Sequence, residues 1–154
     1  MINTSSDYKA EIKKPNPKWK ANATVTFRDG TTTELTNANI MENGVSFSDG
    51  TSEQGNFCVG SFVSKQLNLK IYNGDNNLSE SQFDGASIFY KQGLIIKDSS
   101  GNETVEWVNI GTFYVNNHSE SEKIISVTGY DGAIKFDRKY DSALTYPATL
   151  AEIL

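Results

Sequence analysis

Carboxylate and amide side chains gather in one polar segment of the chain, and these residue types bind hard metal ions. Residues 73–85 read NGDNNLSESQFDG and contain Asp75, Glu80 and Asp84. The ligand spacing of an EF-hand is absent, however, and Asn, Asp, Ser and Gly are also the ordinary composition of an exposed loop. We therefore predict a solvated loop here, with an oxygen-ligand calcium site as the alternative.

The remaining reactive side chains stand apart from one another in the sequence. His118, within NNHSESE, and Cys58 are each the sole residue of their type, whereas a zinc site or an activated thiol needs partners. We predict a surface position for His118 and a small buried apolar role for Cys58. Asp29 and Asp49 belong to two DGT turns, and a glycosidase would need two acids that converge. The sequence thus predicts no catalytic residue, no metal site and no cofactor, in a protein that is not an enzyme.

Two tryptophans, Trp19 and Trp107, offer a different kind of chemistry. Together with the tyrosines they are able to form a platform on which sugar rings stack. The alternative is that they fill a sheet core or a subunit interface, where aromatic residues are enriched. The sequence favours this second position.

Composition and charge narrow the class of protein. A length of 154 residues suits one domain with its own core. Aromatic residues make up 11% of the chain and hydrophobic residues 37%, which favours a β-rich protein. The net charge of −5 argues against a nucleic-acid-binding surface and against attraction to anionic lipid. With one cysteine and no secretion signal or long apolar run, we expect a soluble protein that folds in a cytoplasm, with no specific nucleic-acid binding and no membrane association.

Turn signals separate short runs of alternating apolar residues along most of the chain, which predicts an antiparallel β-barrel or sandwich with short peripheral helices. Asp29-Gly30 predicts a type I′ hairpin turn, and Gly111 predicts a β-bulge or tight crossing. The predicted strands cover 22–28, 31–36, 57–63, 66–72, 86–91, 93–97, 105–115 and 123–129. The predicted helices cover 5–13, 131–139 and the extreme C-terminus.

The alternation also predicts which side chains point into the core. In the strand over 66–72, one face carries Leu67, Leu69 and Ile71. In the strand over 105–115, the predicted inward residues are Val105, Trp107, Phe113 and Val115. Asp131 is predicted to be a helix N-cap that accepts from a backbone N–H two or three residues further on.

The end of the chain bears on domain organisation. It closes on TLAEIL, which begins with a usable N-cap in Thr149 and has no stop signal after it. We expect 1–154 to be a single β-rich domain that forms the N-terminal part of a longer protein.

Four stretches carry a resemblance to a known family, and together they span nearly the whole chain. They are YKAEIKKP, FCVGSFVSKQLNLKIYN, VNIGTFYV and, most specific, ISVTGYDGAIKFDRKYDSALTYPATLAEIL. The order of these signals resembles the N-terminal domain of the baseplate hub or tail-associated protein of phages and prophages of Gram-positive bacteria. Each motif is structural and none is catalytic.

The resemblance implies a structural component of a virion tail that is assembled in the host cytoplasm. Hub proteins of this kind contain β-barrels, form trimers, and mount on the ring of distal tail protein at the end of the tail tube, next to tip or spike proteins. The expected partners are therefore further copies of the full-length protein, the distal tail ring and the tip proteins. A carbohydrate-binding β-sandwich from a surface or receptor-binding protein is the alternative, and it depends on Trp19, Trp107 and the loop 73–85.

Overall fold

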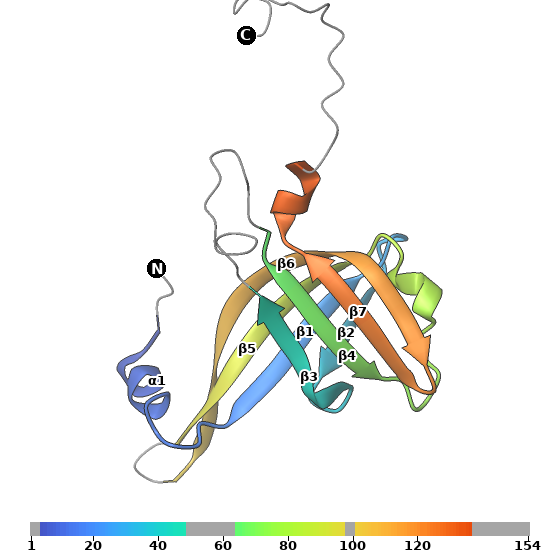
Figure 1. The fold of residues 1–154 in the computed structure, drawn as a ribbon. Helices are drawn as coiled ribbons and strands as arrows, with labels where there is room; N and C mark the ends of the chain where they lie inside the picture. The colour runs from blue at the N-terminus through green and yellow to red at the C-terminus, as the bar shows by residue number, and fades with distance from the viewer. Residues whose placement is uncertain (1–3, 49–63, 98–100, 137–154) are drawn as a thin grey trace, which may run out of the picture.

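The computed structural model describes residues 4–48, 64–97 and 101–136. In these ranges strands far outnumber helices (Figure 1). The strands are β1 (Trp19–Thr26), β2 (Thr32–Thr36), β3 (Ile40–Ser48), β4 (Gln66–Tyr72), β5 (Ser87–Lys97), β6 (Glu103–Ser121) and β7 (Ile124–Tyr130). The helices are α1 (Ser6–Glu11) and two 3-10 turns, η2 (Glu80–Phe83) and η3 (Gly132–Phe136). The prediction of a mainly β protein with short helices is confirmed.

All described strands belong to one antiparallel sheet with the order β2-β1-β5-β6-β7-β4-β3. The sheet is curled. Phe47 of the edge strand β3 packs across the interior against Tyr90 and Phe113, with ring centroids 5.1 Å and 6.0 Å away. The two edge strands do not pair with each other. The turn between β2 and β3 instead bonds to the strands next to the two edges: Asn37 Oδ1 accepts from Ala21 N–H of β1 at 2.8 Å, and the Asn39 carbonyl accepts from Tyr72 N–H of β4 at 2.7 Å.

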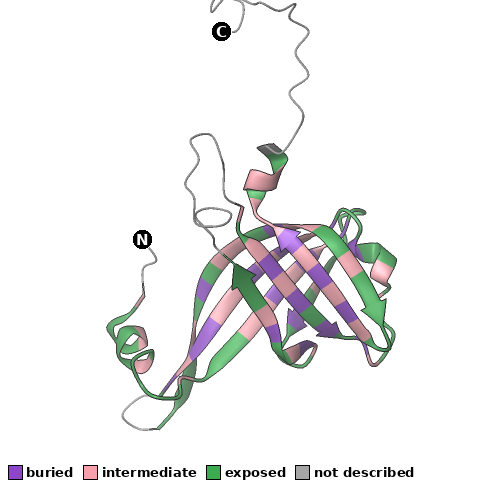
Figure 2. Ribbon diagram, viewed as in Figure 1, coloured by how far each residue is buried: buried purple, intermediate pink, exposed green. Residues whose placement is uncertain are grey.

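The core lies on the concave face of this sheet (Figure 2). As predicted, the inward residues of β4 are fully buried, with Leu67, Leu69 and Ile71 each at most 1% exposed. Phe83 of η2 closes the core and meets Phe27 edge to face at 5.6 Å. Apolar alternation on the strands and one aromatic ring from η2 therefore build the core.

A β-bulge in β6 sets which side chains point inward. Tyr90 pairs with Gly111 and Lys91 with Asn109, so Ile110 has no partner across the ladder. This extra residue confirms the bulge predicted at Gly111. It also reverses which side chains of β6 point inward on either side of the bulge. As a result Phe113 is buried, whereas Trp107 is 42% exposed on the opposite face. The predicted inward position of Trp107 is wrong for this reason, and so is that of Val105, which lies on the same face of β6.

The turn after β1 also differs from the prediction. Phe27 N–H donates to the Thr31 carbonyl at 2.9 Å, and Gly30 N–H donates to the Phe27 carbonyl at 3.0 Å. A type I′ turn needs a positive φ at both central residues, but within this loop only Gly30 has one, at 85°. The loop is therefore a three-residue hairpin connection in which glycine takes the left-handed position.

Other boundaries shift where ladder pairing overrides local signals. β3 was not predicted as a strand, because its alternation is broken by a bulge between Ile40 and Val45. β5 runs unbroken through Gly93, where two strands were predicted, and β6 extends to Ser121. The predicted strand 57–63, the region of Cys58, Asp49 and the C-terminal helix lie outside the described residues.

Candidate functional site

The acidic residues of the loop 73–85 do not converge. Asp75 lines a cavity beside β2 and β4, while Asp84 lines a different cavity near Arg28. Glu80 Oε1 lies 2.8 Å from Nδ1 of His118. Within the described ranges, no three His, Cys, Asp or Glu side chains are close enough to share a metal ion. The arrangement therefore offers no geometry for the calcium alternative.

His118 belongs to β6, not to a loop, because that strand is longer than predicted. Its side chain is 22% exposed and that of Glu80 is 38% exposed. The pair ties η2 to β6, and so holds the segment that carries Phe83 over the core. It acts as a structural contact between two elements.

The two tryptophans lie on opposite faces of the sheet. Trp19 pairs with Leu94, which pairs with Glu106, whereas Trp107 pairs with Gly93. Neighbouring rows of a sheet point to opposite sides. Trp19 and Trp107 therefore cannot form a common platform for a sugar ring.

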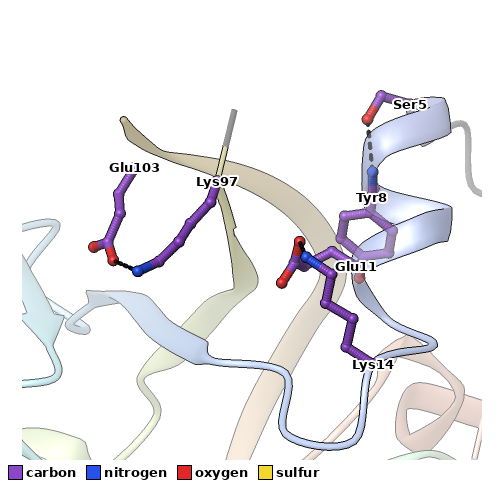
Figure 3. A network of polar contacts seen from close by, with 6 residues as sticks. All are labelled: Ser5, Tyr8, Glu11, Lys14, Lys97 and Glu103. Carbon is purple, nitrogen blue, oxygen red and sulfur yellow. Dashed lines mark hydrogen bonds and ion pairs between the residues drawn. The ribbon is translucent and has the colours of Figure 1, made fainter. Parts of the chain in front are cut away.

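Helix α1 covers the inner face at the Trp19 end. Ser5 caps the helix by accepting from Tyr8 N–H at 3.0 Å (Figure 3), and both its N–H and its hydroxyl donate to the Glu106 carboxylate. Tyr8 meets Trp19 edge to face at 6.5 Å. The hydrogen bonds from Ser5 lower the pKa of Glu106. Burial, and to a smaller degree the charge of Glu106, raises the pKa of Tyr8. These contacts fix α1 to β1 and β6.

The outer face at the same end remains uncovered by described residues, and it is basic. Trp107 lies on Gly93: a Cβ built at Gly93 would stand 2.9 Å from Cε3 of the indole and 2.7 Å from Cγ1 of Val105. Neighbouring rows of this face carry lysines, and Lys97 Nζ pairs with Glu103 Oε1 at 3.0 Å (Figure 3). We call this surface the Trp107 patch; it comprises Lys18, Lys20, Lys91, Lys97, Val105 and Trp107.

The pKa of Glu103 reflects the lysines that lie near it. The hydrogen bond and charge of Lys97, with smaller effects from Lys18 and Lys20, hold the pKa of Glu103 below its usual value. Three lysines thus act on one glutamate, in a chain that has 14 basic and 19 acidic side chains. The Trp107 patch is an exception to the acidic character of the whole chain.

The other end of the sheet carries a cavity of about 400 Å³, which we call the Tyr72 cavity. Its floor and rim include Glu34, Leu35, Tyr72, Asp75, Asn77 and Leu78. Tyr72 is 52% exposed, and its ring lies on Gly74 as Trp107 lies on Gly93. The adjacent β6–β7 turn adds the exposed acids Glu120 and Glu122.

Buried Asn73 holds the loop that forms this cavity. Its side chain donates to the Leu78 carbonyl at 2.7 Å and accepts from Leu78 N–H at 3.1 Å. Its own N–H donates to the Lys123 carbonyl, and Lys123 Nζ donates to the Gly74 carbonyl at 3.0 Å. The cavity is thus part of an ordered loop with satisfied polar groups. The sequence analysis recognised the loop and its asparagines, but it did not indicate that Asn73 and Asn77 line one cavity.

A second opening lies along the seam between β1 and β3. This cavity of about 560 Å³ is lined by residues that include Trp19, Ala21, Asn37 and Val45. Phe47 nearby is 41% exposed, although it contacts core aromatics. The seam therefore exposes part of the apolar interior.

Asp131 is a structural cap, as predicted. Its Oδ1 accepts from Ala133 N–H at 3.0 Å and from the Ser64 hydroxyl at 3.1 Å. The residue begins η3 and links it to the segment before β4. The helix predicted over 131–139 is a 3-10 turn as far as it is described, to residue 136.

Comparison with known proteins gives a likeness to a solved structure. No protein-family model matches the chain, and no curated protein does. A solved structure described as the virion of a native gene transfer agent particle contains a chain with a similar fold, at a TM-score of 0.51 and 11% identity. The likeness covers 90% of this chain and 48% of that one, so this chain spans about half the length of its structural neighbour. At this identity the likeness establishes the fold alone.

Membrane insertion by a helix receives no support. Among the described segments, every helix falls short of the length and apolar character needed to cross a bilayer.

Proposed function

We propose that this chain is a structural component of a phage-like virion, a hub-type tail protein that joins the end of the tail tube to the tip. The observation that carries the proposal is the fold shared with a virion chain over 90% of the present chain. The sequence motifs that resemble baseplate hub proteins of Gram-positive hosts point in the same direction. In this role the protein is not an enzyme, requires no cofactor, and resides in the virion tail after assembly in the host cytoplasm.

The charge distribution supports such a role. A net charge of −5 repels phosphate backbones, which suits a wall past which DNA moves without being held. Rigid exposed aromatics at both ends of the sheet, Trp107 and Tyr72, are the residue types that anchor protein interfaces. The proposed partners are other copies of the full-length protein, the distal tail ring and the tip or spike proteins, with neither nucleic acid nor membrane among them.

Particle analysis tests this function. Particles are purified by density from a strain that produces them and from a strain with the gene deleted, and both are examined by mass spectrometry and electron microscopy. We expect peptides of this chain in intact particles, and particles with absent or incomplete tails in the deletion strain. Restoring the gene in trans should restore tails. Intact, infectious particles without this protein would overturn the proposal.

The carbohydrate-binding alternative loses its structural basis. Trp19 and Trp107 lie on opposite faces, and the loop 73–85 lies beside the β6–β7 turn at the far end of the sheet. No observation brings these three features to one binding site. Glycan binding by the isolated chain would nevertheless be measured in parallel, and saturable binding would favour this alternative.

A further inference from the structure

We propose that the Trp107 patch of one copy docks into the Tyr72 cavity of a second copy, which gives a head-to-tail contact between chains. The inference rests on the proposed function in one respect, since it names a partner surface for an assembly protein. Its evidence, however, comes from three features of the described surface: charge, shape and position.

The first feature is complementary charge. The Trp107 patch presents Lys18, Lys20 and Lys97 around a single glutamate. The Tyr72 cavity presents Asp75, and the adjacent β6–β7 turn adds the exposed acids Glu120 and Glu122. The Glu34 carboxylate is held on the outer face of the sheet, where it accepts from Asn22 Nδ2 at 2.6 Å. Because the chain as a whole is acidic, a second copy offers negative charge to which the basic patch is able to bind. Such pairing orients the encounter and rejects the reverse arrangement, because like charges would meet.

The second feature is an exposed aromatic ring on one surface and a cavity on the other. Trp107 is 42% exposed, yet Gly93 beneath the ring and Val105 beside it restrict its position. The cavity at the other end measures about 400 Å³ and has Tyr72 on its wall. Pockets of roughly 300–1,000 Å³ accommodate small organic groups, and buried tryptophans and tyrosines dominate binding energy at interfaces. A preorganised ring loses little entropy when it docks.

The third feature is position. β6 is 19 residues long and contributes Trp107 near one end. Its other end lies at the β6–β7 turn, where Tyr72 pairs with Ile124. In Figure 1 the β5–β6 hairpin and the β6–β7 turn stand at opposite sides of the molecule. Two different surfaces that fit each other make a heterologous contact, which closes into a ring or continues as a filament. Each copy can therefore bind one neighbour at each end.

The location of α1 is consistent with this arrangement. It covers the inner face of the hairpin end through Ser5 and Tyr8, which leaves Trp107 on the outer face. The hairpin thus has one face committed to the fold and another open to a partner.

Cross-linking between copies is the first test. Chains labelled with nitrogen-14 and nitrogen-15 are mixed over a range of concentrations up to the solubility limit, treated with a zero-length carbodiimide, and digested for mass spectrometry. We expect mixed-isotope cross-links that join Lys18, Lys20 or Lys97 to Asp75, Glu120 or Glu122. Mixed-isotope links confined to other surfaces, or none at any concentration, would overturn the proposal.

Complementary variants are the second test. Trp107→Ala and Lys20→Glu should each raise the dissociation constant of self-association at least ten-fold in sedimentation experiments, as should Asp75→Lys at the other surface. Lys13→Glu and Glu42→Lys make the same charge changes at exposed positions after α1 and on β3, and should leave the constant within two-fold. Circular dichroism verifies that each variant is folded. Equal association by all variants would refute the interface.

Mixing the variants tests the pairing itself. Lys20→Glu chains and Asp75→Lys chains should each associate poorly alone, yet form a one-to-one complex when combined, since each retains one intact surface. Failure of the mixture to associate would contradict a head-to-tail contact. Fluorescence anisotropy with labelled single- and double-stranded DNA tests whether DNA binds the Trp107 patch in place of a second copy. DNA binding that is lost in Trp107→Ala would also overturn the proposal.

The outcomes separate this inference from the proposed function. If a chain with both Lys20→Glu and Trp107→Ala enters intact particles as the wild type does, the interface is wrong and the virion role stands. If wild-type chains associate through these surfaces but are absent from particles, the virion role is wrong and the interface stands.

Discussion

Glu106 shows how one side chain can hold an element in place. Its carboxylate accepts from both the N–H and the hydroxyl of Ser5, the residue that also caps α1. These bonds favour the ionised form and lower the pKa of Glu106 from its usual value of 4.5. A group whose pKa is lowered by folding contributes stability above its unfolded pKa and loses that contribution as the pH falls through the folded value.

We therefore expect the contacts that hold α1 to weaken as the pH falls below 4.5 and through the lowered pKa of Glu106. Hydrogen exchange at the amides of α1 should accelerate before that of β7, which has no contact with Glu106. Glu106→Gln keeps an acceptor but does not titrate, so it serves as the control. If exchange in α1 responds to pH equally in this variant, Glu106 is not the cause.

Asp131 supports a prediction about stability. Its carboxylate satisfies Ala133 N–H and the Ser64 hydroxyl. Asp131→Ala should lower the free energy of unfolding by about 1 kcal/mol, as for other lost N-caps, while Asp131→Asn retains an acceptor and should cost less. Urea denaturation measures both. A loss in Asp131→Asn as large as in Asp131→Ala would show that capping is not its role.

At the scale of elements, η2 acts as a plug. Phe83 is fully buried and meets Phe27 edge to face. Phe83→Ala should lower the free energy of unfolding by roughly 3–5 kcal/mol, because it leaves a cavity in the core. Phe83→Leu fills part of that space and should cost clearly less. Equal losses in thermal or urea denaturation would mean that Phe83 does not act through packing.

The bulge in β3 depends on a glycine that the sequence did not single out. A Cβ at Gly44 would lie 2.8 Å from the Met41 carbonyl oxygen and 3.0 Å from that of Lys70. Because both contacts are with backbone, Gly44→Ala should destabilise the fold by about 1–3 kcal/mol. Gly132→Ala meets nothing within 4 Å and should stay within about 0.5 kcal/mol. A neutral Gly44→Ala variant in denaturation experiments would show that β3 can shift.

At the scale of the whole molecule, the curled sheet has two different ends. One end carries the lysines around Trp107 and the other carries the acids around Tyr72. This difference in charge between the two ends is the basis of the proposed contact between copies of the chain. Contacts between exposed charges weaken with salt, so the extent of association should depend on ionic strength.

We expect the full-length protein to be a trimer, and the 154-residue chain to be a monomer or a weak oligomer in dilute solution. Stable interfaces usually bury about 1,200–2,000 Å², and we expect the 154 residues to supply only part of such an interface. Light scattering on both proteins tests the expectation. A full-length protein that remains monomeric at high concentration would count against a hub.

The sequence by itself determined the class of fold and several local details. Alternation placed Leu67, Leu69 and Ile71 on the buried face of one strand. Asp131 and Gly111 were interpreted correctly as a cap and a bulge. These features depend on residues close in sequence, where capping geometry and the two-residue period of a strand act directly.

Tertiary structure decided what depends on distant residues. The bulge at Gly111 reversed the direction of Trp107, so an apparent core residue became an exposed one above Gly93. Pairing with β4 made a strand of β3 across its own bulge. The rows of the ladder gathered Lys20 and Lys97, and the curl of the sheet brought β2 and the loop that carries Asp75 to the same cavity. Charge and aromatic surfaces arise from strand register, and register is set by long-range pairing that local sequence patterns do not contain.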